Sequence, residues 1–119
     1  MEILKELSAF YDIYVFSSLK DVLVNKILKR LDPKNTIFKG VFSKFFCQKV
    51  AKGIYIKDLR IFMNKSLKDM VLVDKSLYSF ACQMDNGICL MPWVDDPEDC
   101  ELLYLKKYLI ELSFCDDVR

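Results

Sequence analysis

The sequence contains no histidine at any of its 119 positions. Without histidine, Ser-His and Cys-His nucleophilic triads are excluded, and so is any metal site built on imidazole. Carboxylates, hydroxyls and lysines are the groups left to carry whatever chemistry the chain performs.

Long apolar runs and a signal sequence are also missing. No run approaches the roughly 18 to 20 apolar residues that span a membrane, and the opening residues MEILKEL lack the features of a secretory signal. We therefore expect an intracellular protein without a membrane span, in the nucleus or cytoplasm. A mitochondrial location is the alternative, although the start of the chain is neither rich in arginine nor free of acidic residues.

Cysteine spacing and charge exclude two further classes. No two cysteines are separated by two residues, which argues against zinc and against a disulfide framework. We expect reduced, mostly buried thiols at Cys47, Cys82, Cys89, Cys100 and Cys115. The net charge is +1 and the lysines are spread along the chain, so nucleic-acid binding is not expected.

The composition that remains is that of an ordinary folded protein. Hydrophobic residues make up 53% of the chain, and its length suits a single domain over residues 1–119. Residues with helical spacing alternate with short β-rich runs, which predicts an α/β fold with a mainly parallel sheet. We expect helices over residues 2–10, 20–31 and 95–112, and strands over residues 12–16, 70–74 and 88–90.

Three details of this pattern are specific enough to check. The apolar face of the second helix is expected to consist of Val22, Leu23, Ile27, Leu28 and Leu31. Residues 38–46 and 54–56, on either side of Gly53, are expected to form a pair of short strands or a flap. Trp93 is expected to lie in the core.

Four polar residues follow the predicted strands and form the candidate site. They are Ser17, Lys57, Asp74 and Lys75. A hydroxyl and a lysine can hold the oxygens of a phosphate, and a carboxylate can hold magnesium. The alternatives are that Ser17 and Asp74 only cap turns and that Lys57 is a solvated surface lysine.

The order of the motifs resembles the carboxy-terminal-domain phosphatases of the NLI-interacting-factor type, in the haloacid dehalogenase superfamily. The matching stretches cover nearly the whole chain: residues 10–18, 31–32, 55–59, 71–74, 85–88, and the positions from Trp93 through Asp95 and Asp99 to Leu102. The resemblance implies a haloacid-dehalogenase-like three-layer sandwich. It also implies magnesium-dependent dephosphorylation of phosphoserine or phosphothreonine in proteins, such as the tail of RNA polymerase II.

The resemblance gives each candidate residue a role. Ser17 stands in the place of the family's phosphate-binding threonine and Lys57 in that of its phosphate-binding lysine, while Asp74 matches a magnesium-binding aspartate. The family has asparagine where this chain has Lys75. We expect Lys75 to pair with Asp74 and to weaken magnesium binding, unless its side chain points outward.

The nucleophile that the family uses is missing from these 119 residues. It belongs to an Asp-x-Asp-x-Thr motif several dozen residues before the position of Ser17, whereas sixteen residues precede Ser17 here and none form that motif. We expect the chain to be truncated at its amino terminus, without the strand that bears this motif, and to be inactive as given. A truncated gene model, a split or degenerate gene and a specialised small protein all explain this.

Two functions are therefore carried forward. The first is a protein phosphatase without its catalytic amino-terminal part. The second is a non-catalytic relative that binds phosphopeptides or other proteins, as the translocase-subunit branch of the family does. In both, the expected partner is a phosphoprotein or another protein.

Overall fold

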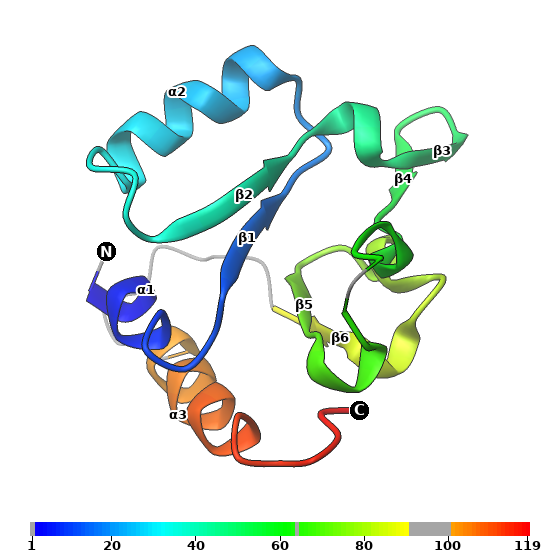
Figure 1. Ribbon diagram of the computed structural model, residues 1–119. Coiled ribbons are helices and arrows are strands. Elements are labelled where there is room, and N and C mark those ends of the chain that lie inside the picture. Colours follow the sequence, from blue (N-terminus) through cyan, green and yellow to red (C-terminus); the bar gives the residue numbers. More distant parts are fainter. Residues whose placement is uncertain (1, 64, 91–100) are drawn as a thin grey trace. The chain divides into compact units, whose positions relative to one another are not determined.

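The computed structural model describes residues 2–63, 65–90 and 101–119, which form two compact units (Figure 1). One unit comprises residues 2–45 and 101–114. The other comprises residues 46–63, 65–90 and 115–119. The single domain expected from the sequence stays a prediction.

The first unit contains a parallel β-α-β motif. Strand β1 (Ile13–Phe16) leads into helix α2 (Asp21–Leu31), and strand β2 (Phe38–Phe42) then pairs with β1 in parallel. The helix is the crossover that two parallel strands require. Both the β1 strand and the α2 helix lie within a residue or two of the expected positions.

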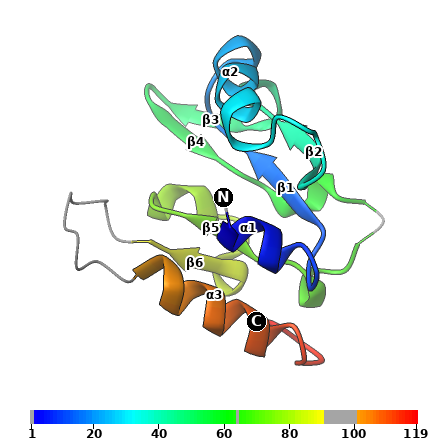
Figure 2. The ribbon, with the colours of Figure 1, turned by 90° about the vertical axis from the view of Figure 1, so that its left-hand side faces the viewer.

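Two helices from opposite ends of the chain pack together in this unit. Helices α1 (Glu2–Leu7) and α3 (Glu101–Leu112) lie side by side, as Figures 1 and 2 both show. The Tyr11 hydroxyl donates a hydrogen bond to the Leu109 carbonyl at 2.6 Å, and the side chains of Lys106 and Glu6 form an ion pair at 2.6 Å. The expected start of the last helix, residues 95–100, lies outside the described residues, as do Trp93 and Cys100.

Helix α2 buries a different face from the one expected. Val24 is buried and Leu28 partly so, whereas Val22, Leu23 and Ile27 are exposed. Leu28 and Leu31, which are partly buried, belong to the expected face, whereas Val24 was not included in it, so spacing placed the buried stripe only approximately. Three members of the expected apolar face, Val22, Leu23 and Ile27, are therefore not buried.

The turn after α2 is fixed by one carboxylate. The side chain of Asp32 accepts hydrogen bonds from the backbone N–H groups of Thr36, Ile37 and Phe38, at 2.9 to 3.1 Å. These bonds satisfy donors that the turn would otherwise bury. Asp32 therefore sets where β2 begins.

The second unit is built from two strand pairs and short 3-10 turns. Strands β3 (Gln48–Ala51) and β4 (Ile54–Ile56) form an antiparallel hairpin that turns at Gly53, whose φ is +77°. Strands β5 (Leu72–Asp74) and β6 (Gly87–Cys89) pair in parallel. The turns are η2 (Leu59–Ile61), η3 (Leu67–Asp69), η4 (Leu77–Phe80) and η5 (Met84–Asn86).

A small apolar core holds this unit together. Leu59, Leu72 and Phe80 are buried against one another, with Phe62, Leu67 and Met70 packed around them. Strand β6 passes so close to this core that a Cβ on Gly87 would lie 2.5 Å from the ring of Phe80. The position therefore requires glycine for space, not for its backbone conformation.

The strand pairing differs from the expectation in two respects. The described strands form three two-stranded sheets, two parallel and one antiparallel, in place of one mainly parallel sheet. The β4 strand also pairs with residues 48–51, not with the 38–42 run, which pairs with β1. What is confirmed is a small α/β protein with short parallel and antiparallel strands. None of its described helices is both long and apolar enough to cross a membrane.

Candidate functional site

Two of the predicted site residues meet in the second unit. The ammonium of Lys57, which directly follows β4, forms a hydrogen-bonded ion pair with Oδ2 of Asp74, the last residue of β5. Their side chains are 11% and 12% exposed, so the pair is largely removed from water. Removal from water strengthens the attraction between the two charges and raises the cost of leaving either one unpaired.

Two serines complete the environment of Asp74. The Ser79 hydroxyl donates to Oδ2 at 3.0 Å, and the backbone N–H of Ser76 donates to Oδ1 at 3.1 Å. Burial raises the pKa of the Asp74 carboxyl, but the hydrogen bonds from Lys57, Ser76 and Ser79 and the charge of Lys57 outweigh it, so the pKa is lowered. Asp74 is therefore a carboxylate at neutral pH.

Lys57 is anchored through its backbone as well. Its N–H donates to the carbonyl of Ser79 at 3.2 Å, which fastens the end of β4 to turn η4. Lys57 is thus fixed at the main chain by the same residue that holds its partner carboxylate.

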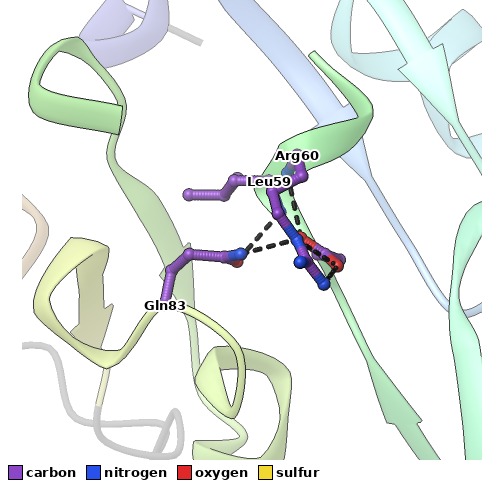
Figure 3. A network of polar contacts seen from close by, with 4 residues as sticks. Leu59, Arg60 and Gln83 are labelled. Atoms are coloured by element: carbon purple, nitrogen blue, oxygen red, sulfur yellow. Dashed lines mark hydrogen bonds and ion pairs between the residues drawn. The ribbon is translucent and has the colours of Figure 1, made fainter. Parts of the chain in front are cut away.

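The residue after Lys57 belongs to a polar network (Figure 3). Asp58 accepts hydrogen bonds from the side chain and N–H of Arg60, and Gln83 donates to Asp58 at 2.7 Å while accepting from the Leu59 N–H at 2.9 Å. The bonds from Arg60 hold the pKa of Asp58 well below its usual range against the upward effect of burial. This network fixes the residues that directly follow Lys57 in the sequence.

Lys75 does not make the contact that the sequence predicts. Its side chain is exposed, and within the described part of the chain it is Lys57 that pairs with Asp74. A residue that directly follows a strand end projects differently from the one before it, so Lys75 is adjacent in sequence without facing the carboxylate. Its expected effect on magnesium stays a prediction, but the amine in position to exert such an effect is Lys57.

Ser17 follows β1 and belongs to the first unit. Its backbone N–H donates to the Phe42 carbonyl at 2.8 Å, and its hydroxyl accepts from the Leu19 N–H at 3.1 Å. The second bond is the turn-capping role that the sequence allowed as an alternative. The phosphate-binding role of Ser17 beside Lys57 and Asp74 stays a prediction.

The charges of Lys57 and Asp74 both act on the thiol of Cys47. Burial raises the pKa of Cys47, the charge of Lys57 lowers it and that of Asp74 raises it, and the net effect is upward. The group is therefore a neutral thiol near pH 7, and a neutral thiol is a poor nucleophile.

The described residues do not fit a magnesium ion, which the resemblance implies at Asp74. Both oxygens of Asp74 already accept hydrogen bonds, and one of them faces an ammonium. Across residues 2–63, 65–90 and 101–119, no three cysteine or acidic side chains gather to hold a metal. Magnesium prefers several oxygen ligands in octahedral geometry, which one paired carboxylate does not supply.

Comparison with known proteins identifies the family. All of the chain, residues 1–119, matches the NLI interacting factor-like phosphatases. The chain belongs to this family. The resemblance inferred from the sequence motifs is thereby confirmed.

Relatives in this family have different names. The chain is 36% identical over 118 residues to CTD small phosphatase-like protein 2 of Dictyostelium discoideum, covering 99% of this chain and 20% of the relative. It is 31% identical to CTD nuclear envelope phosphatase 1B of Danio rerio, covering 98% and 46%. It is 30% identical to the mitochondrial import inner membrane translocase subunit tim50 of Aspergillus fumigatus, covering 89% and 21%. The chain thus spans less than half the length of each.

Sequence reasoning missed the residues that support the site. Ser79, Ser76 and Gln83 hold Asp74 or the chain beside Lys57, yet each is a common polar residue in a 3-10 turn or next to one. No spacing rule marks them out. The available signal was their closeness in sequence to Asp74, because short turns fold back onto the strand that precedes them.

Proposed function

We propose that this chain binds a phosphorylated serine or threonine side chain of a partner protein through the ammonium of Lys57. It does so as part of a haloacid-dehalogenase-like sandwich and does not itself hydrolyse the phosphate ester. A polypeptide that also carried the Asp-x-Asp-x-Thr motif would be a protein phosphatase.

The observation that carries this proposal is the state of the Lys57 ammonium. An ammonium has three N–H donors, and in the described part of the chain one of them is used, by Asp74. The ion pair with Asp74 fixes the Lys57 side chain, so its other donors are held in place for the oxygens of a phosphate without a large ordering cost.

The same ion pair limits the affinity. Asp74 cancels the charge of Lys57, so an incoming phosphate meets a neutral pair and not a bare cation. We therefore expect weak binding of inorganic phosphate and tighter binding only where the rest of a phosphopeptide adds contacts. This suits recognition of a phosphorylated protein better than retention of a small anion.

The proposed lack of turnover rests on the motif content of these 119 residues. No Asp-x-Asp-x-Thr motif occurs among the 119 residues, and electrostatic groups alone do not replace an attacking carboxylate. The single paired carboxylate at the site also argues against a bound magnesium ion.

The names of the relatives support a location for this function. They include a nuclear envelope phosphatase and a mitochondrial inner membrane translocase subunit. We propose that the chain acts inside the cell, at the nucleus or in the mitochondrion.

A second candidate is recognition of a protein partner without phosphate, favoured by the 30% identity to the tim50 translocase subunit.

A pair of peptides separates the two candidates. A phosphoserine peptide from the tail of RNA polymerase II and its unphosphorylated form are titrated against the wild-type chain and the Lys57→Gln variant by fluorescence anisotropy.

The proposal predicts that only the phosphorylated peptide binds, that Lys57→Gln removes this preference, and that no inorganic phosphate is released with magnesium present. Equal binding of both peptides would favour the second candidate. Magnesium-dependent release of phosphate by the chain itself would overturn the proposed lack of turnover.

A further inference from the structure

Ser79 contacts both members of the ion pair. Its hydroxyl donates to Asp74 Oδ2 at 3.0 Å, and its carbonyl accepts from the Lys57 N–H at 3.2 Å. Its own N–H donates to the Ser76 carbonyl at 3.2 Å, which closes turn η4. The residue is 4% exposed, so these bonds are protected from water.

We propose that Ser79 is a positioning residue for the Lys57 site: its hydroxyl holds Asp74 Oδ2, and its carbonyl holds the backbone that carries Lys57. This inference rests on the proposed binding of phosphate by Lys57. Ser79 touches neither the phosphate nor the Lys57 ammonium, and it acts through Asp74.

Ser79 affects Lys57 because Asp74 Oδ2 divides its negative charge between two hydrogen-bond donors. This oxygen accepts from the Lys57 ammonium and from the Ser79 hydroxyl. Without the hydroxyl, Lys57 is the one side-chain donor left on that oxygen among the described residues. The ammonium is then drawn more closely to Asp74 and is less available to an anion.

The chain supplies a matched control in the same turn. Ser76 also contacts Asp74, but through its backbone N–H, and its side chain is exposed. Ser76→Ala therefore removes a hydroxyl three residues away while leaving the ion pair and the hydrogen bonds of Asp74 in place. Ser79→Ala removes a hydroxyl that Asp74 uses.

The primary test is the titration of the Asp74 carboxyl, followed by carbon NMR in the wild type, Ser79→Ala and Ser76→Ala. A hydrogen bond to the charged form favours that form, so Ser79→Ala should raise the titration midpoint and Ser76→Ala should leave it unchanged. Ser79→Thr, which keeps the hydroxyl, should restore the wild-type midpoint. Identical midpoints in wild type and Ser79→Ala would overturn the inference.

A measurement on the wild type tests the contact between Ser79 and Asp74 even if Ser79→Ala fails to fold. The Cβ resonance of Ser79 should titrate with the same midpoint as the Asp74 carboxyl, because protonation of Asp74 weakens the bond from Ser79. A Ser79 resonance that does not respond over that range would contradict the proposed contact.

Phosphate binding separates this inference from the function on which it rests. Inorganic phosphate should bind Ser79→Ala about three- to tenfold more weakly than the wild type, the scale of one typical net hydrogen bond, and Ser76→Ala as well as the wild type. If the wild type binds neither phosphate nor a phosphoserine peptide, the proposed function fails, whereas the carboxyl titration still decides the role of Ser79. If Ser79→Ala shifts the midpoint of the Asp74 titration but leaves phosphate affinity unchanged, the proposed effect of Ser79 on phosphate binding is overturned.

Discussion

Lys57 and Asp74 lie seventeen positions apart in the sequence, yet they form an ion pair that is largely buried. Each follows or ends a different short strand, and turn η4 joins the two strand ends through Ser79. The pair is electrically neutral as a whole. An anion that approaches Lys57 competes with Asp74, and a cation that approaches Asp74 competes with Lys57.

Magnesium binding should respond to Lys57 and not to Lys75. We predict that calorimetric titration finds weak or no magnesium binding in the wild type, because the Lys57 ammonium faces the one carboxylate at the site. Lys57→Gln removes that charge and should increase the affinity, whereas Lys75→Asn should change little because Lys75 is exposed. A clear gain with Lys75→Asn and none with Lys57→Gln would show that Lys75 is the competing amine.

Stability should depend on pH through Asp74. Hydrogen bonds and the Lys57 charge lower the pKa of Asp74 in the folded state below its unfolded value of about 3.9. The stabilisation is therefore fully present above the unfolded pKa and is lost as the pH falls through the folded pKa. The difference in free energy of unfolding between wild type and Asp74→Asn should be constant near neutral pH and shrink below about pH 4.

Urea unfolding of both proteins at a series of pH values measures this difference. Asp58 and Asp117 also have lowered pKa values, that of Asp117 about 2 through its hydrogen bonds from Arg119, and they remain in both proteins. Their contribution cancels in the comparison. A difference that grows as the pH falls would contradict the assignment to Asp74.

Gly87→Ala should destabilise the second unit. An added Cβ would lie 2.5 Å from the ring of Phe80, in the core with Leu59 and Leu72. Overpacking of this kind costs about 1 to 3 kcal/mol, which a shift in the urea midpoint would report. Gly53→Asn is the control, because that position is open and asparagine tolerates a positive φ; an equal loss in both variants would rule out the steric cause.

Gln83→Ala should loosen the chain beside Lys57. The amide of Gln83 bonds both Asp58 and the Leu59 N–H (Figure 3), and its loss leaves that N–H without this partner. We expect a loss of about 1 to 3 kcal/mol in the free energy of unfolding, measured with urea. Gln48→Ala, at an exposed position of β3, should cost much less, and a comparable cost there would show that the network is not responsible.

The local elements were predictable because each has a local cause. The α2 helix ends where Asp32 and Pro33 stop it, and β1 is a compact β-rich run, so both were found near their observed bounds. The strand partners were not predictable from pattern. Residues 38–42 and 48–51 both form strands. Which of them pairs with β1 and which with β4 depends on long-range packing.

The site was predictable in part for a similar reason. Lys57 and Asp74 could be singled out because they stand at strand ends, and the structure brings them together. For Lys75 the structure shows the outward-pointing alternative, because a neighbour in sequence need not be a neighbour in space. The contribution of Ser79 depends on a turn that folds back over the strand end, and nothing in the residue itself indicates that geometry.

The most direct test of the account is the effect of charge at the pair on phosphate affinity. Inorganic phosphate is titrated into the wild type, Lys57→Gln, Asp74→Asn and the double variant, with folding of each verified by circular dichroism. Removing the Asp74 charge should strengthen binding about tenfold or more, since charges a few ångströms apart interact by several kcal/mol at an effective dielectric of about 20. Removing the Lys57 charge should abolish binding in both backgrounds. If both single substitutions leave the affinity unchanged, or if Lys57→Gln binds phosphate as well as the wild type, Lys57 is not the phosphate-binding group.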